Sequence, residues 1–399
     1  MNHAGTRRLS CILLCLITAV SWAVADEGPF LIAEDAVYAE RPVHAITKDG
    51  YAVAWYDWMN EAYRFGRMDR QGRSIGEQLR FTLPDAFLGG AFYTTGHLIQ
   101  VHDGFLFVAQ MGAAEAWAVH IDKEGSFLDP PSLLIESDEL YPVQLASGPS
   151  GPVLAYPEWR GFFHNWVQPL TSTGTPRTLR LPLAASTIPA VGPALYTKSM
   201  DLVRDGNRFL AVWNHYNIGV RLRELNSRGV PQGDVVLIQN NANHVQHVAA
   251  AAEDGVQLIL YSEGLPESDI LMKKRYRDGT VSDPVVLAGT GLNEAGRQSD
   301  WMIDRPLQAL AHKDRLYVLY VIERPGTYYS WHLAEFDLDG NPTAPLRNLS
   351  DEYQINTFYD IDFTLDADHD RCVLTWSGLG PQSWGGYLLA VDCKGAGNS

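Results

Sequence analysis

Cysteine is scarce in this sequence, with only four residues among 399. So few thiols exclude a small scaffold held together by many disulfides, and they exclude a metal site built from several cysteines. Cys11 and Cys15 lie in an N-terminal segment that we expect to be removed, which leaves Cys372 and Cys393. In an exported protein we expect these two residues to form one disulfide.

Basic residues are also in deficit. The chain has 31 Lys and Arg against 47 Asp and Glu, a formal net charge of −16. An acidic surface repels the phosphate backbone of nucleic acids and the head groups of anionic membranes. We therefore expect neither nucleic acid nor a membrane surface as a partner.

Long apolar runs are missing except near the N-terminus. There Arg7 and Arg8 precede the run LSCILLCLITAV, and an A-x-A cleavage signal ends at Ala25. These are the parts of a bacterial secretory signal peptide, and the run is too short to span a bilayer. We predict a signal peptide at 1–25 and a single mature domain at 26–399, monomeric, without a membrane span, and periplasmic or secreted.

The common catalytic motifs are absent as well. The sequence contains no G-x-S-x-G, no H-E-x-x-H, no phosphate-binding glycine loop and no dinucleotide fingerprint. DADHDRC (366–372) superficially suggests a calcium loop, but it lacks the sixth-position glycine, and we interpret it as a turn. His244 and His247 have metal-like spacing for a helix, yet at the start of a strand their rings would point to different sides. We expect no cofactor and no bound metal.

What the sequence has in abundance is one short pattern, an apolar residue, then Asp or a relative, two polar residues and Gly. Its copies are about 50–60 residues apart, a period that favours solenoids and propellers. Asp or Asn followed by a glycine with positive φ is typical of a tight hairpin. The motif glycines, seven in number, are Gly72, Gly125, Gly174, Gly229, Gly279, Gly340 and Gly395.

A second turn, usually ending in DG, lies about 20 residues before each of these glycines. Between the two turns runs an apolar segment without helical periodicity, which predicts a strand buried on both faces. Another short apolar segment follows each of the first six motifs. Each unit is thus predicted to be a four-stranded antiparallel meander, and seven units favour an all-β, seven-bladed β-propeller. Paired sandwiches do not require seven such copies, and β-helices repeat at shorter periods.

The seventh motif, VDCKG at 391–395, has no strand after it. The segment GPFLIAED (28–35) resembles the strands that follow other motifs, so we predict that it completes the last blade and closes the ring. Cys372 begins one predicted strand of that blade and Cys393 ends its neighbour. A disulfide there would strengthen the closure.

The second predicted strands end in a recurring way. Six of the seven finish on an aromatic residue, which we interpret as packing between blades: Trp55, Tyr156, Trp213, Tyr261, Tyr320 and Trp376. Shortly after these, an acid or a histidine follows in five units: Asp57, Glu158, His215, Glu263 and Glu323. Side-chain alternation would place this second set at the rim of one face. The sequence predicts a partial ring of carboxylates there.

Long, varied loops share that face, and functional residues concentrate on such loops. Carboxylates accept hydrogen bonds from sugar hydroxyls, flat rings offer apolar faces to pyranose C–H groups, and two acids close together could cleave a glycosidic bond. The catalytic candidates are Asp57, Glu158, Glu263 and His215. The ligand-binding candidates are Trp58, Trp159, Arg160, Tyr216, Trp301, Arg305, Glu323, Tyr328 and Trp384.

Three alternatives to glycan binding or glycoside hydrolysis remain open. The acids could be an ordinary solvated surface, since the whole chain is acidic. His97, His164 or His215 could serve a polysaccharide lyase, with an arginine neutralising a uronate, although no loop is markedly basic. The same face could instead dock a protein partner, which would make the chain a non-catalytic scaffold of the cell envelope or secretome.

The repeats resemble those of secreted bacterial seven-bladed propellers over the whole mature chain. SDWMIDRPLQAL (299–310) is similar to blade openings in sialidase-like propellers, because an aspartate and Arg-Pro lead into a strand. The S-x-D-x-G-x-T-W box of that family is absent from every unit. The resemblance implies the fold and no particular reaction.

Overall fold

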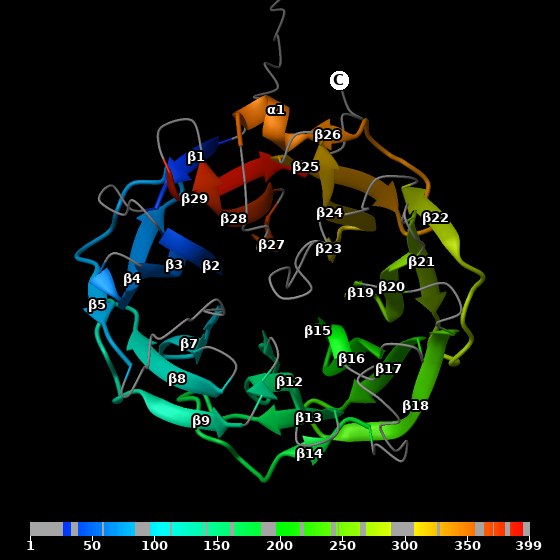
Figure 1. The fold of residues 1–399 in the computed structure, drawn as a ribbon, viewed down its shortest axis with the longest axis horizontal. Coiled ribbons are helices and arrows are strands. Elements are labelled where there is room, and N and C mark those ends of the chain that lie inside the picture. The colour runs from blue at the N-terminus through cyan, green and yellow to red at the C-terminus, as the bar shows by residue number, and fades with distance from the viewer. Residues whose placement is uncertain are drawn as a thin grey trace, which may run out of the picture.

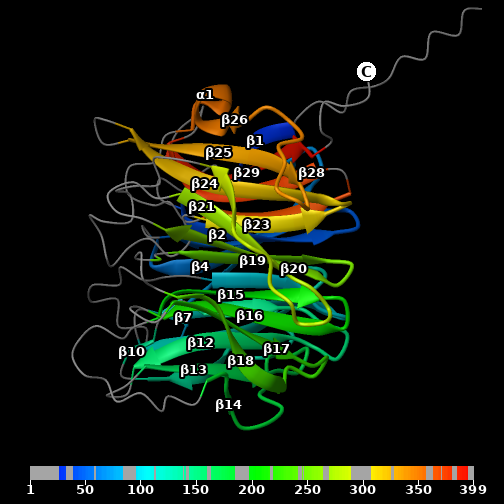
Figure 2. The same cartoon turned by 90° about the vertical axis from the view of Figure 1, so that its right-hand side faces the viewer.

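The computed structural model forms a ring of seven antiparallel sheets around a central channel, a seven-bladed β-propeller as predicted (Figure 1). Strands run across the ring from one face to the other, and short turns gather at one face (Figure 2). The structure describes residues 27–32, 39–57, 60–83, 96–111, 114–137, 139–140, 143–159, 163–184, 197–215, 219–240, 245, 247–263, 269–288, 307–324, 328–355, 363–369, 371–379 and 384–393.

Each blade is a meander from an inner strand at the channel to an outer strand at the circumference. The first blade is β2 (Ala39–Thr47), β3 (Gly50–Asp57), β4 (Ala62–Asp69) and β5 (Leu79–Phe81). The second is β6 (Gly96–Gln100), β7 (Gly104–Met111), β8 (Glu115–Asp122) and β9 (Ser132–Glu136). The third has a divided inner edge and contains β10 (Glu139–Leu140), β11 (Gln144–Ala146), β12 (Val153–Trp159), β13 (Phe163–Pro169) and β14 (Leu181–Pro182).

The remaining blades follow the same order. The fourth is β15 (Thr197–Asp205), β16 (Arg208–His215), β17 (Gly219–Leu225) and β18 (Pro231–Asn240). The fifth is β19 (Val248–Glu253), β20 (Val256–Glu263), β21 (Asp269–Arg275) and β22 (Val285–Ala288). The sixth is β23 (Leu307–His312), β24 (Arg315–Arg324), β25 (Tyr328–Asp337) and β26 (Arg347–Asn348). The seventh is β27 (Phe363–Asp368), β28 (Arg371–Leu379), β29 (Trp384–Asp392) and β1 (Glu27–Leu31).

The outer strand of the sixth blade is shorter than the apolar run APLRNL predicts. Pairing stops after Asn348, whose side chain accepts a hydrogen bond from the Asp351 backbone N–H at 3.2 Å. That contact caps a single helical turn, α1 (Leu349–Tyr353), because an Asn oxygen satisfies a backbone donor at the start of a helix. Leu349 remains buried in the apolar cluster between the last two blades.

The repeated five-residue motif forms the same turn in each described copy. In the first blade, the Gly72 N–H donates to the Asp69 carbonyl at 3.0 Å, and an Asp69 carboxylate oxygen accepts from the backbone N–H groups of Gln71 and Arg73. Gly72 has φ = 76°, a conformation that L side chains rarely adopt. Five of the six described copies carry Asp, Asn or Thr at this position, and in the fifth blade Tyr276 occupies it while Asp278 accepts the Thr280 N–H instead. All six end in a glycine with positive φ.

The second strand of every blade is buried on both faces, as predicted. Along β3, Ala52, Ala54 and Tyr56 pack toward the second blade. The alternating residues Val53 and Trp55 pack toward the seventh. Each of the seven interfaces between neighbouring blades contains one such apolar cluster. The strand-end aromatics belong to these clusters and are nearly inaccessible to solvent, which confirms their interpretation as packing residues.

The N-terminal strand closes the ring, as the unpaired last motif predicts. In β1, Phe30 pairs with Leu388 and Leu31 with Tyr387 of β29, so the first described residues complete the last blade. A disulfide joins Cys372 of β28 to Cys393 beyond β29, with Cα atoms 5.5 Å apart. The predicted disulfide is therefore confirmed.

Polar contacts join the seventh blade to the first. Asp368 is buried and accepts hydrogen bonds from the Arg70 guanidinium and the Tyr51 hydroxyl. Burial raises the pKa of Tyr51 to about 12, so its hydroxyl remains a donor at neutral pH. His44 Nδ1 lies 3.2 Å from Thr375 Oγ1. These contacts lie beside the apolar cluster that the two blades share.

Replacing Cys372 and Cys393 together by alanine should lower the free energy of unfolding by about 3 kcal/mol, since the bond restricts a loop of about 20 residues in the unfolded chain. Urea denaturation of oxidised protein measures this difference. Reduced wild-type protein should unfold at the midpoint of the double variant. Equal midpoints for oxidised wild type and variant would show that the closure does not depend on the disulfide.

Candidate functional site

Asp57, the first catalytic candidate, is enclosed rather than presented to solvent. Its side chain is 1% exposed, and Oδ2 accepts hydrogen bonds from Arg64 Nε at 2.7 Å and Asn60 Nδ2 at 2.8 Å. Oδ1 accepts from the Asn60 backbone N–H at 3.2 Å. The carboxylate therefore neutralises an arginine on the neighbouring strand and fixes the start of the following loop.

Glu158 has a similar environment in the third blade. It is fully buried, and its Oε2 accepts from Arg180 Nη1 at 2.7 Å. The Arg180 guanidinium lies over the Trp166 ring, 4.4 Å from its centroid, and His164 stacks against the same ring. Trp166 therefore already contacts a cation and a second ring of the protein itself.

Glu263 and the remaining acids do not gather with these two. Glu263 is half-buried and accepts hydrogen bonds from Gln239 Nε2 at 3.2 and 3.3 Å. Asp57, Glu158 and Glu263 belong to the first, third and fifth blades, and each has its own donor. The described contacts of all three are those of structural pairs.

The other candidates lie wholly or partly outside the described residues. Trp58, Arg160, Tyr216, Trp301 and Arg305 are outside them altogether, as is most of the sialidase-like segment. For a second group, only the position in a strand is described and the side chain is not: Trp159, His215, Glu323, Tyr328 and Trp384. These candidates therefore stay predictions.

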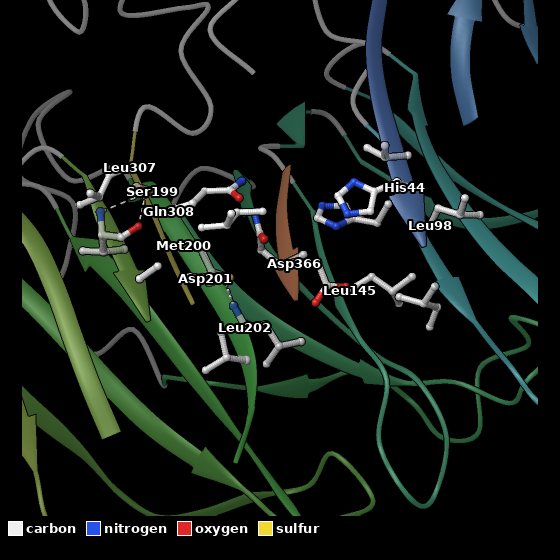
Figure 3. A pocket seen from close by; sticks show the side chains of 18 residues that line it. His44, Leu98, Leu145, Ser199, Met200, Asp201, Leu202, Leu307, Gln308 and Asp366 are labelled. Carbon is white, nitrogen blue, oxygen red and sulfur yellow. Dashed lines mark hydrogen bonds between the residues drawn. The ribbon is translucent and has the colours of Figure 1, made fainter. Parts of the chain in front are cut away.

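The structure instead brings polar side chains together in the central channel. A cavity of about 280 Å³ lies there, lined by the inner strands of all seven blades. Figure 3 shows Asp201, Gln308, Asp366 and the His44 ring around this space. Within the described part of the chain, no group of three or more His, Cys, Asp or Glu has a geometry that would hold a metal ion.

Four of the lining residues occupy equivalent registers in their blades. Each pairs with the second-strand residue directly before the strand-end aromatic position, which Ala109 occupies in the second blade, so the four lie at one depth in the channel. The pairs are His97 with Val108, Gln144 with Ala155, Asp201 with Val212, and Gln308 with Leu319. We call His97, Gln144, Asp201 and Gln308 the polar girdle.

Gln144 differs from its neighbours in the girdle. Its side chain is only 6% exposed and lines the cavity, yet it forms no hydrogen bond with any other residue the structure describes. By contrast, both carboxylate oxygens of Asp201 accept backbone N–H groups, from Leu202 and Ala250, each at 2.8 Å. Because the Gln144 amide lies at the cavity wall, water or a ligand in the cavity is the partner open to it.

Two titratable groups of the cavity are shifted by their surroundings. Burial lowers the pKa of His44 to about 4, so the ring is neutral at physiological pH. Asp366 is exposed to solvent within the channel, but the surrounding protein replaces much of the bulk water and raises its pKa to about 6. The Asp368 charge adds to this rise, while the Ala367 backbone N–H and His312 oppose it.

The polar girdle was not among the predicted sites, because the candidate residues came from the ends of the second strands and from the loops. The signal was present in the inner strands, where single polar residues interrupt apolar runs, as in HLIQ, VQLA, MDLV and LQAL. Without the register of each strand pair, however, nothing in these runs shows that the four residues lie at one depth.

Comparison with known proteins adds nothing beyond the fold. No protein-family model and no curated protein matches the chain. Among solved structures, the Dos1 propeller is 9% identical, with a TM-score of 0.48 over 93% of this chain and 96% of that one. AofleA from Arthrobotrys oligospora is 11% identical, with a TM-score of 0.46 over 82% and 89%.

A third similar structure is the catalytic domain of the Coprinopsis cinerea GH62 alpha-L-arabinofuranosidase. It is 9% identical, with a TM-score of 0.39 over 63% of this chain and 90% of that one. Likenesses at this level carry no argument about ligand or activity. Separately, none of the helices in the described ranges is long and apolar enough to cross a membrane.

The pairing of Glu158 with Arg180 predicts unequal costs for removing each partner. Arg180→Met keeps the contact with Trp166 but leaves a fully buried carboxylate, and should lower the free energy of unfolding by about 3–5 kcal/mol. Glu158→Gln should cost about 1–2 kcal/mol, because Arg180 is partly exposed and can turn to water. Urea denaturation at pH 7 measures both.

If Arg180→Met and Glu158→Gln cost the same, packing rather than the buried charge accounts for the effect.

Proposed function

We propose that the protein binds a carbohydrate, and that a single sugar ring enters the central channel and bonds to the polar girdle. The unpartnered Gln144 amide carries this proposal, because it offers two donors and an acceptor to whatever fills the cavity. Asp201 and Gln308 add acceptors and donors at the same depth. Sugar hydroxyls both donate and accept, so a mixed set of this kind suits them.

The apolar part of the cavity supports the same ligand class. Leu98, Leu145 and Leu202 follow their girdle residues directly and line the same space. A sugar ring has C–H faces as well as hydroxyls, and it can contact both kinds of group. At about 280 Å³ the cavity is at the lower end of small-molecule sites, which favours one ring rather than a long chain.

We propose binding rather than cleavage by the acids of the second strands. Hydrolysis of a glycosidic bond usually requires two carboxylates on either side of that bond. Asp57 and Glu158 are buried, lie on separate blades and are each paired with an arginine. These features support a structural role for the two acids.

A protein-interaction role is the second candidate. Five neighbouring blades each expose a large apolar side chain on or beside the outer strand: Leu133, Leu179, Leu237, Val286 and Leu346. Exposed apolar side chains at the circumference could contact another protein. For either function, we propose that residues 1–25 are a signal peptide and that the mature protein acts outside the cytoplasm as a monomer.

Thermal unfolding of the 26–399 protein against mono- and oligosaccharides tests the first proposal. A sugar at one hundred times its Kd should stabilise the protein by about 2.7 kcal/mol and raise the midpoint. Gln144→Leu should abolish this shift. Without ligand the variant should be about as stable as wild type, because the amide has no hydrogen bond to a described residue to lose.

Gln71→Leu is the matched control, since it makes the same change on an exposed turn far from the channel and should keep the full shift. If no sugar moves the midpoint of wild-type protein, carbohydrate binding is wrong and protein partners become the leading hypothesis. A shift that Gln144→Leu retains would place the sugar elsewhere on the molecule.

A further inference from the structure

The cavity becomes aliphatic directly below the polar girdle, toward the face of the short turns. The layer one residue deeper pairs with the second-strand residues two places before the strand-end aromatic position. Five of its lining residues are aliphatic and come from five blades (Figure 3): Leu98, Leu145, Leu202, Ala309 and Leu365. The sixth is His44, whose ring contacts Thr375 of the seventh blade. A group that extends from the girdle toward the turns therefore passes mainly aliphatic side chains.

The deepest level of the cavity lies two residues below the girdle. Among the described lining residues, Ile99, Val203 and Asp366 lie at this level, on the inner strands of the second, fourth and seventh blades. Each pairs with the residue three places before the strand-end aromatic position. At about 3.3 Å per residue, this level is about 7 Å from the girdle. We call Ile99, Val203 and Asp366 the cavity floor.

Asp366 is the one acid of the floor, and its hydrogen bonding is incomplete. Oδ1 accepts the Ala367 backbone N–H at 2.7 Å. Oδ2 forms no hydrogen bond with any other residue that the structure describes, and the side chain lines the cavity. Water or a ligand in the cavity is therefore the partner open to this oxygen.

The groups around Asp366 set the pH at which it ionises. The other titratable or cationic groups on β27 and on the strands packed against it are Asp368, His44, His312 and Arg371. Burial raises the pKa of Asp366 to about 6, and the Asp368 charge adds to this rise while His312 opposes it. Arg371 Nη2 lies 3.9 Å from the Asp368 carboxylate. Burial lowers the pKa of His44 to about 4, so between pH 5 and pH 7 Asp366 changes its charge and His44 does not.

A floor of this kind binds an apolar group and a proton together. Aliphatic surface gains free energy when apolar atoms cover it instead of water. An ionised carboxylate loses its hydration when it is covered in the same way, which is costly. A protonated carboxyl carries no charge and loses much less. An apolar group at the floor should therefore favour the protonated form of Asp366.

We infer that the ligand is a glycoside with a short apolar substituent, and that the substituent passes the aliphatic layer to the cavity floor while the sugar ring bonds to the polar girdle. This inference rests on the proposed function, because it names the chemical class of ligand for the same site. The distance of about 7 Å from girdle to floor suits a butyl chain or a phenyl ring. Because the bound substituent covers Asp366, binding takes up a proton there, and affinity falls as the pH rises.

Isothermal titration calorimetry of the 26–399 protein with the methyl and butyl β-glycosides of glucose, galactose and mannose tests the inference. The two glycosides of each sugar differ only in the length of the alkyl group. Burying one methylene strengthens binding by up to about fourfold, so at pH 5 the butyl glycoside of the recognised sugar should bind at least about tenfold more tightly than the methyl glycoside. Butanol alone should not bind.

The sign and size of the pH effect follow from Asp366. Its pKa of about 6 means that it is largely protonated at pH 5 and largely ionised at pH 7. The affinity for the butyl glycoside should therefore fall about tenfold between these two pH values. The methyl glycoside should show a much smaller change, because its substituent does not reach the floor.

Three variants test the floor. Asp366→Asn should bind the butyl glycoside equally at pH 5 and pH 7, and the raised pKa of Asp366 predicts that the variant is at least as stable as wild type at pH 7. Val203→Thr places a hydroxyl at the floor and should reduce the ratio of butyl to methyl affinity several-fold. Val281→Thr is the matched control, since it makes the same change at a half-buried position in the outer half of the fifth blade and should keep the ratio.

The possible failures are distinct. If no glycoside binds, the proposed function and this inference both fall. If the methyl and butyl glycosides bind equally at pH 5, sugar binding stands and the apolar substituent is wrong. Butanol that binds as tightly as the butyl glycoside would mean that the sugar is not recognised, which would overturn both. A pH dependence that persists in Asp366→Asn would place the proton uptake elsewhere and overturn the role of the floor.

Discussion

The structure depends on the burial of each blade's second strand between two neighbours. Because side chains alternate along a strand, Ala52, Ala54 and Tyr56 pack on one side of β3 and Val53 and Trp55 on the other. Every blade therefore contributes to two apolar clusters, and removing one blade would expose both. This requirement makes the ring close, and it explains why the N-terminal strand returns to the last blade rather than remaining an independent edge.

The same constraint leaves the inner strands free to carry polar residues. An inner strand pairs with only one neighbour and faces the channel, so His97, Gln144 and Gln308 are tolerated in otherwise apolar segments. The residues beside them fill the clusters between blades. Packing requirements thus place the polar residues at a common depth around the cavity.

The acids at the ends of the second strands show what a sequence pattern can predict and what it cannot. Their spacing after the aromatic residues is regular, and alternation correctly places Asp57 on the same side as Trp55. The spacing does not show which residue pairs with each acid. Arg64 lies on the neighbouring strand β4, and Arg180 lies directly before β14, two strands away from Glu158. Their contacts pair the buried carboxylates of Asp57 and Glu158 with a cation. Charge at a strand end indicates that a counter-charge or solvent is present, and only the strand pairing says which.

From the sequence alone we could predict the number of blades, the turn chemistry, the two-sided burial of the second strands, the disulfide and the closure by the first strand. Each of these follows from local conformational rules or from a repeat, and both are visible in the linear chain. The tertiary structure decided which polar residues meet. Gln144, Asp201 and Asp366 come from three different blades, and their proximity depends on register and on the radius of the ring. The register and the radius are set only when the sheets pack together, so neither can be predicted from a local sequence pattern.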